Sequence, residues 1–179
     1  MLVAWHPFQK IPSDKRPLVF ALLCVVTISL VIIMEVKKVE PRGIISLELA
    51  GDVPTAQQIV ESWDMSSQRN ALFSMRLDFL LTIAYSNTIG LGCFWAAETI
   101  STDAQGVSAV GIILAWSQWL AALLDVVENI ALLSMLCISV TQPFPTIALW
   151  CAVPKFELIV AGLLYTGVAV GIGIFCHVL

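Results

Sequence analysis

The chain has 179 residues, of which 59% are hydrophobic and 12% are charged, and its mean hydropathy is +0.91. Soluble domains carry about 25% charged residues, so this composition excludes an ordinary soluble domain and favours a protein whose solvent is lipid. The formal net charge is −4, and lysine and arginine form no basic stripe of the kind that binds nucleic acid. We therefore expect a membrane protein without a nucleic-acid partner.

Four uncharged stretches are long enough to cross a bilayer as helices: residues 17–34, 79–97, 104–124 and 158–179. About 20 apolar residues span a hydrocarbon core of ~30 Å. The first stretch follows basic residues, as in a cleaved signal peptide. Its apolar run is too long for one, however, and EVKKVE follows where small cleavage-site residues belong. We interpret it as a retained span of a multi-pass protein.

The last three spans belong to helical patterns that are longer than a bilayer requires. Residues 66–98 and 107–140 contain no proline, and residues 146–178 contain only Pro154. A helix of such a length extends for about 50 Å. We predict an all-α membrane protein with a single domain over residues 1–179. Its four transmembrane helices form an antiparallel bundle, and helices two to four extend beyond one membrane face.

Residues 37–76 form an extramembrane segment that carries many of the charged residues. The stretch GDVPTAQQIVESW begins with a possible N-cap, Asp52 or Thr55, and has Pro54 near its first turn. It then places apolar residues at helical spacing, which predicts a short amphipathic helix that packs on the extended bundle: Ala56, Ile59, Val60 and Trp63. The preceding IISLELA is too short to classify.

The stretch ALLDVVENIALL places three polar residues on one face of an apolar helix. In antiparallel helices, two residues that are equally far in sequence from the turn between them lie at the same height along the bundle. Counted in this way from the turns near Asp103 and Gln142, polar residues of three helices lie at one height. We take them as candidates for binding a ligand or ion: Arg76, Asp78, Asp125, Glu128, Asn129 and Lys155. Glu35 and Lys37, at the end of the first span, can reach the same height.

The same count predicts a second polar layer nearer the membrane centre: Asn87, Gln118, Tyr165 and Thr166. Gln118 continues the stripe of Asp125 and Glu128, with only small residues between them, which is typical of an interior face in a membrane bundle.

Two interpretations of the acidic layer stay open. It is either a buried ion-pair layer that fixes helix register, or a functional cluster that binds an ion, a proton or a polar headgroup. In both cases the acids need partners, because an unpaired charge at the bilayer centre costs at least ~2.5 kcal/mol. We expect Lys155 within salt-bridge reach of Glu128 or Asp125, with Asp78 or Arg76 at the same level.

The chain lacks the usual signs of catalysis or metal binding. It has two histidines far from the acids and five cysteines without a CxxC pair, and no GxSxG, HExxH or phosphate-binding loop occurs. We predict no catalytic residue and no metal site, and we assign no cofactor.

The segments ISLELAG, AQQIVESW, LDFLLTIAY, WLAALLDVVENIALL and KFELIVAGLLY resemble a group of small four-span integral membrane proteins to which no activity is assigned. The similarity covers most of residues 44–165. It implies the fold and no activity.

Our leading functional hypothesis is a non-enzymatic membrane bundle that serves as an accessory protein or whose polar layer binds a small ligand, a lipid headgroup or an ion. The alternatives are a small transporter or proton-coupled carrier that uses Asp125 and Glu128, and, third, an intramembrane lipid-modifying enzyme. Expected partners are membrane lipids and another membrane protein or a second copy, because Gly167 and Gly171 form a GxxxG pattern that serves either dimerisation or internal packing. The basic amino-terminal tail favours a cell or inner membrane with the amino terminus inside.

Overall fold

The computed structural model describes residues 5–99 and 105–178, and these residues are helical with no strand among them. The elements follow in the order η1 (Pro7–Lys10), α1 (Arg16–Val36), α2 (Ile44–Glu48), α3 (Val53–Ser62), α4 (Met65–Thr99), α5 (Gln105–Cys137) and α6 (Phe144–Val178). The prediction of an all-α four-helix bundle is confirmed.

Helices α1, α4, α5 and α6 are each long and apolar enough to cross a membrane. α4 has 35 residues, α5 has 33 and α6 has 35. At 1.5 Å per residue these helices are about 50 Å long, which exceeds the hydrocarbon thickness. The expectation that the last three helices are longer than a bilayer requires is therefore confirmed.

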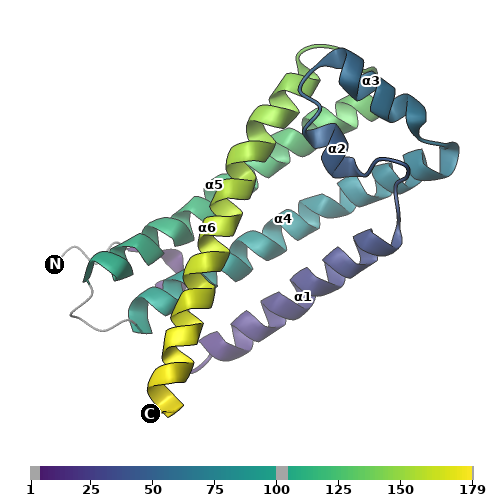
Figure 1. Cartoon of the computed structure of the whole chain (residues 1–179). Helices are drawn as coiled ribbons and strands as arrows, with labels where there is room; N and C mark the ends of the chain where they lie inside the picture. Colours follow the sequence, from purple (N-terminus) through teal and green to yellow (C-terminus); the bar gives the residue numbers. More distant parts are fainter. Residues whose placement is uncertain (1–4, 100–104, 179) are drawn as a thin grey trace.

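Figure 1 shows α4, α5 and α6 packed along one another, with α1 lying beside α4. α1 has no buried apolar side chain along its length, and Leu18, Val25 and Ile32 are each more than half exposed. A helix that is apolar and this exposed needs lipid or another protein around it.

Helices α2 and α3 cover one end of the bundle, close to the connection between α5 and α6 (Figure 1). Asp52 begins α3 as its N-cap, because Oδ1 accepts a hydrogen bond of 2.8 Å from the backbone N–H of Thr55. Ile59 and Trp63 are buried against Leu132 on α5 and other small or apolar residues of α4–α6. The predicted amphipathic helix and the face with which it packs are confirmed.

Residues 130–153 do not form a separate re-entrant hairpin. They complete α5, turn, and begin α6, so they belong to the same long helices. Their apolar side chains, among them Leu132, Met135 and Ala148, are buried beneath α2 and α3. This arrangement explains why the sequence remains apolar beyond the length that a bilayer would demand.

The amino-terminal segment packs against α4 and α5, in the half of the bundle away from α2 and α3. His6 is fully buried between the rings of Phe8, Phe94 and Trp119. Burial lowers the pKa of its imidazole to about 4, so His6 is neutral at physiological pH. Arg16 forms an ion pair with Glu98 at the end of α4 and ties the start of α1 to this region.

Candidate functional site

An ion-paired group lies where α5 faces α6. Lys155 Nζ on α6 is 2.9 Å from Asp125 Oδ1 and 2.8 Å from Glu128 Oε2 on α5. The exposed fraction is 5% for Lys155, 2% for Asp125 and 1% for Glu128. The two acids are three residues apart on one helix face, so one ammonium group contacts both. The predicted salt bridge is confirmed.

Helix α4 contributes the other side of the layer. Thr82 donates a hydrogen bond of 2.7 Å to Asp125 Oδ2, and Asn129 Nδ2 donates one of 2.6 Å to Asp78 Oδ2. Asp78 and Thr82 are four residues apart and therefore share a face of α4. Three helices thus meet at one level, as the residue counts predicted, with Asp78 rather than Arg76 as the α4 member.

Glu48 on α2 is the member of the layer that sequence reasoning missed. Leu47 anchors α2 in the apolar core, and the indole N–H of Trp63 donates a hydrogen bond of 2.6 Å to the carbonyl of Arg42 just before α2. Glu48 is 9% exposed, and its carboxyl group lies near enough to that of Glu128 to influence its ionisation. Burial raises the pKa of Glu48, and nearby Lys155 opposes the increase.

The proximity of Glu48 and Glu128 favours a proton on one of them. Glu48 Oε2 and Glu128 Oε1 are both buried, and neither has a hydrogen-bond donor among the described residues. Two carboxylates cannot donate to each other, whereas a carboxyl group donates to a carboxylate. Like charges at close range cannot both ionise easily, so a proton held by one of the two carboxyl groups would relieve their repulsion.

A cavity of about 440 Å³ opens beside the layer, between the end of α1, the connection to α2, α4 and α5. Its inner wall includes Glu48, Ser74, Asp78 and Asn129. Ser74 is 2% exposed, and its hydroxyl has no hydrogen-bond partner among the described residues. The remaining lining residues come from α1, the connection, α2 and α4: Met34, Glu35, Lys37, Lys38, Val39, Glu40, Gly43, Ile44, Ile45 and Met75.

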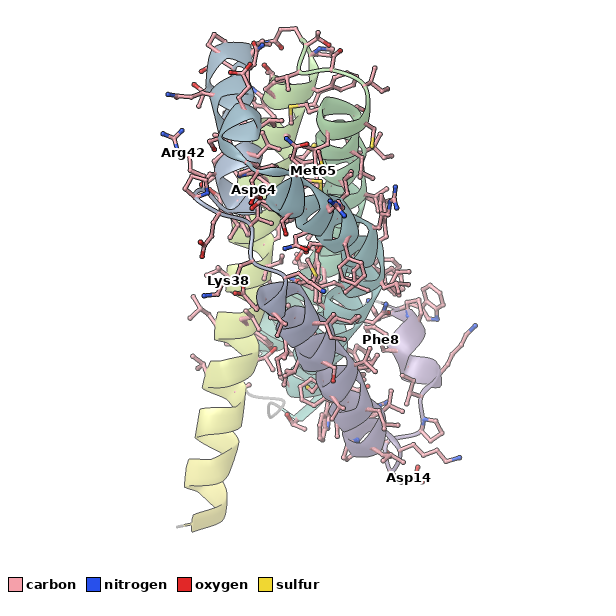
Figure 2. The ribbon with its side chains drawn as sticks, turned by 90° about the vertical axis from the view of Figure 1, so that its right-hand side faces the viewer. Phe8, Asp14, Lys38, Arg42, Asp64 and Met65 are labelled. Atoms are coloured by element: carbon pink, nitrogen blue, oxygen red, sulfur yellow. The ribbon has the colours of Figure 1, made fainter. Side chains whose placement is uncertain are left out.

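Glu35 and Lys37 therefore lie close to the layer, as the sequence indicated, but on the outer part of the cavity. Figure 2 shows Lys38 where the chain leaves α1 and Arg42 further along the same connection. Lys37 and Lys38 are both exposed and have no ion pair among the described residues. The cavity thus has an acidic inner wall and a rim of mixed charge.

Arg76 does not join the layer, and its placement there was wrong. Its side chain is exposed and forms no ion pair among the described residues. Arg76 has the same height as Asp78, but two residues along a helix rotate the side chain by about 200°, which turns it to the opposite face. Counting from a turn fixes height and leaves the direction of the side chain open.

The four residues of the second predicted layer do not contact one another as a layer. Asn87 donates to the carbonyl of Ile83 in its own helix, and Gln118 Nε2 donates to that of Leu158. The hydroxyl of Tyr165 donates to the carbonyl of Val107, and Thr166 lies 3.5 Å from Cys93 Sγ. Within the described residues no hydrogen bond connects any two members of this set, and none of them lines the cavity.

α6 approaches α4 and α5 closely at the level of Gln118. A Cβ atom added at Gly162 would lie 2.6 Å from both Gln118 Nε2 and Ile89 Cγ2. Gly167, in contrast, has no atom within 4 Å of such a position. Gly162 on α6 therefore mediates close internal packing, as Gly92 on α4 and Gly111 on α5 also do, whereas Gly167 does not pack against the rest of the described chain.

Metal binding finds no support in the described part of the chain, where no three His, Cys, Asp or Glu side chains are arranged to hold a metal ion. No protein-family model, curated protein or solved structure matches this chain. The fold and the site together define a helical bundle with four helices of membrane-spanning length and a polar layer in which Lys155 pairs with the buried Asp125 and Glu128, near the buried Glu48 and the half-buried Asp78.

Proposed function

We propose that this chain is a multi-pass membrane protein that binds a small cationic group at its acidic layer, as a binding or accessory protein rather than an enzyme. The observation that carries the proposal is the charge imbalance in the layer. Glu48, Asp78, Asp125 and Glu128 lie in one region of the bundle, and the ammonium group of Lys155 contacts two of them, Asp125 and Glu128. Burying an excess of carboxylates is strongly unfavourable unless protons or cations compensate it.

The contacts of each acid indicate which of them are free to take a ligand. Asp125 is satisfied by Thr82 and Lys155. Glu48 and Asp78 lie on the cavity wall, and Glu48 Oε2 has no donor among the described residues. A cation that enters the cavity therefore meets these two carboxyl groups first, and Lys155 stays with Asp125 and Glu128.

Transport is the alternative, and it has less support. A carrier that used Asp125 and Glu128 would need a polar path through the bundle, and the second set of polar residues offers the obvious route. The cavity does not include Asn87 or Gln118 among its lining residues. His6 and the aromatic rings around it pack against α4 and α5 near Gln118. A cavity that does not reach these polar residues favours binding over passage.

Thermal unfolding of the detergent-solubilised full chain tests the proposal. A ligand that binds only the folded state stabilises it, by about 2.7 kcal/mol at a concentration of 100 Kd. Ethanolamine, ammonium and sodium chlorides are compared at matched ionic strength and neutral pH. We expect at least one of them to raise the Tm of the wild type and of Glu61→Gln, an exposed acid on α3, and to leave Asp78→Asn unaffected. Equal responses of wild type and Asp78→Asn to every cation would refute the proposal.

A further inference from the structure

We infer that the cavity binds a primary ammonium group joined to a phosphate, the headgroup chemistry of an ethanolamine phospholipid. The ammonium would lie against Glu48, Ser74 and Asp78 on the inner wall, and the phosphate against Lys37 and Lys38 at the rim. This inference rests on the proposed function and specifies the ligand of that same site.

The inner wall offers acceptors that lack donors. Glu48 Oε2 and the Ser74 hydroxyl belong to side chains that are at least nine-tenths buried, and neither has a partner among the described residues. A primary ammonium group has three N–H donors and can satisfy several such acceptors at once. Because unsatisfied buried polar groups are unfavourable, two of them on one cavity wall indicate a missing donor.

The same wall argues against a quaternary ammonium group. Choline-type cations have no N–H donor and are held by aromatic cages. Of the described residues that line the cavity, none is aromatic. A choline headgroup would therefore cover Glu48 Oε2 and the Ser74 hydroxyl without satisfying either of them.

The rim carries charges of both signs, because Glu35 and Glu40 line it together with Lys37 and Lys38, and the two lysines are the groups that can meet a phosphate. α1 ends at Val36, and Lys37 and Lys38 follow directly, where the chain leaves the apolar span. Lysine at such a position attracts phosphate groups at the membrane surface. A purely anionic headgroup would meet the acidic inner wall, whereas a zwitterion matches the wall with its amine and the two lysines with its phosphate.

The cavity itself suits a group of this size. Its volume of about 440 Å³ lies within the range of small-molecule sites, roughly 300–1,000 Å³. Apolar residues, among them Met34, Ile44 and Ile45, line the same space and can contact the glycerol end of a lipid. The position next to α1, which is exposed along its length, places the cavity next to lipid.

Binding of short-chain lipids to the full chain in detergent tests the inference. Isothermal titration compares short-chain phosphatidylethanolamine with phosphatidylcholine and phosphatidylglycerol of the same chain length, and with free phosphoethanolamine and ethanolamine. We expect phosphatidylethanolamine to bind at least about tenfold more tightly than the other two lipids, since a lost charged hydrogen bond changes affinity by about that factor. If free phosphoethanolamine also binds, a soluble zwitterion is a second source of the ligand. If free phosphoethanolamine does not bind, the ligand is the lipid.

Two exposed lysines provide variants that should fold normally. Lys37→Met with Lys38→Met should weaken binding of phosphatidylethanolamine at least about tenfold and leave binding of ethanolamine unchanged. Arg42→Met, on the same connection but outside the cavity lining, is the matched control. Equal affinity for phosphatidylcholine, tighter binding of phosphatidylglycerol, or no effect of the lysine pair would overturn the inference. If the inference fails but ethanolamine still stabilises the wild type, the proposed binding of a cation stands. If ethanolamine gives no stabilisation either, both the inference and the proposed function are wrong.

Discussion

The ammonium nitrogen of Lys155 lies 2.8 Å from Oε2 of Glu128, and the exposed fractions of the two side chains are only 6% and 1%. The pair joins α5 to α6 in the region that α2 also reaches through Glu48. The membrane-spanning helices and the extramembrane segment therefore meet at this ion pair. Breaking it should affect both.

Removing the lysine should destabilise the bundle strongly. Lys155→Met leaves two buried acids without their counter-ion, and the loss of one member of a buried ion pair typically costs ~3–5 kcal/mol. Adding Glu128→Gln should recover part of that loss, because it removes one of the uncompensated charges. Unfolding in detergent measures both variants. Arg76→Met, at a similar height but exposed, serves as control and should change stability by less than about 0.5 kcal/mol. A Lys155→Met protein as stable as this control would contradict the account of the layer.

Stability should depend on pH through Glu48. Its pKa is raised in the folded state because burial disfavours the charged form. The folded state therefore binds the proton more tightly than the unfolded state, so the stabilisation is complete at low pH and is lost as pH rises from about 4.5 through the raised pKa. Glu48→Gln should flatten the pH dependence of the unfolding free energy over that range.

Glu61→Gln, on the exposed side of α3, is the control and should keep the wild-type pH dependence. If Glu48→Gln and Glu61→Gln give the same curve, Glu48 does not hold a proton in the folded state.

Close packing of α6 at one glycine should be sensitive to a single methyl group. Gly162→Ala places a Cβ 2.6 Å from Ile89 Cγ2 and Gln118 Nε2. Overpacking of this kind typically costs ~1–3 kcal/mol. Gly167→Ala, on the same helix with no atom within 4 Å, should have little effect on monomer stability. Equal Tm values for the two variants would show that α6 does not approach its neighbours at Gly162.

Trp63 should control whether α2 stays on the bundle. Its ring is 3% exposed, and its indole N–H bonds to the carbonyl of Arg42, next to α2. Trp63→Ala should cost ~3–5 kcal/mol, as large core truncations do. It should also expose residues 37–64 to protease before the remaining helices unfold. Simultaneous digestion of the whole chain would show that the segment has no separate unfolding step.

Much of this architecture follows from the sequence, because apolar length and helical spacing are strong signals. The height of Asp125, Glu128 and Lys155 along the bundle could be predicted from residue counts. Two antiparallel helices joined by a short turn have the same rise per residue, so equal counts from the turn give equal heights. The same counts misplaced Arg76, because height says nothing about direction around the helix. For Asn87 and Gln118, the backbone carbonyls of nearby helical residues provide partners that a sequence pattern does not reveal.

Glu48 could not be found in this way. α2 has five residues, which is too short for a helical period to appear. One signal was present: a single acid between leucines in SLELA, where an exposed helix would carry more polar residues. Only the packing of Leu47 and Trp63 onto the bundle brings that acid to Glu128, and such tertiary contacts are not encoded in local spacing.

Infrared difference spectroscopy of the full chain in detergent tests the central claim most directly, because it distinguishes protonated carboxyl groups from carboxylates. The account predicts that the wild type holds a protonated carboxyl group at neutral pH, that Glu48→Gln reduces this signal, and that addition of ethanolamine perturbs the carboxyl bands in the wild type and not in Asp78→Asn. A spectrum with no protonated carboxyl group at neutral pH and no response to ethanolamine would contradict the claim that protons and a bound cation together compensate this layer.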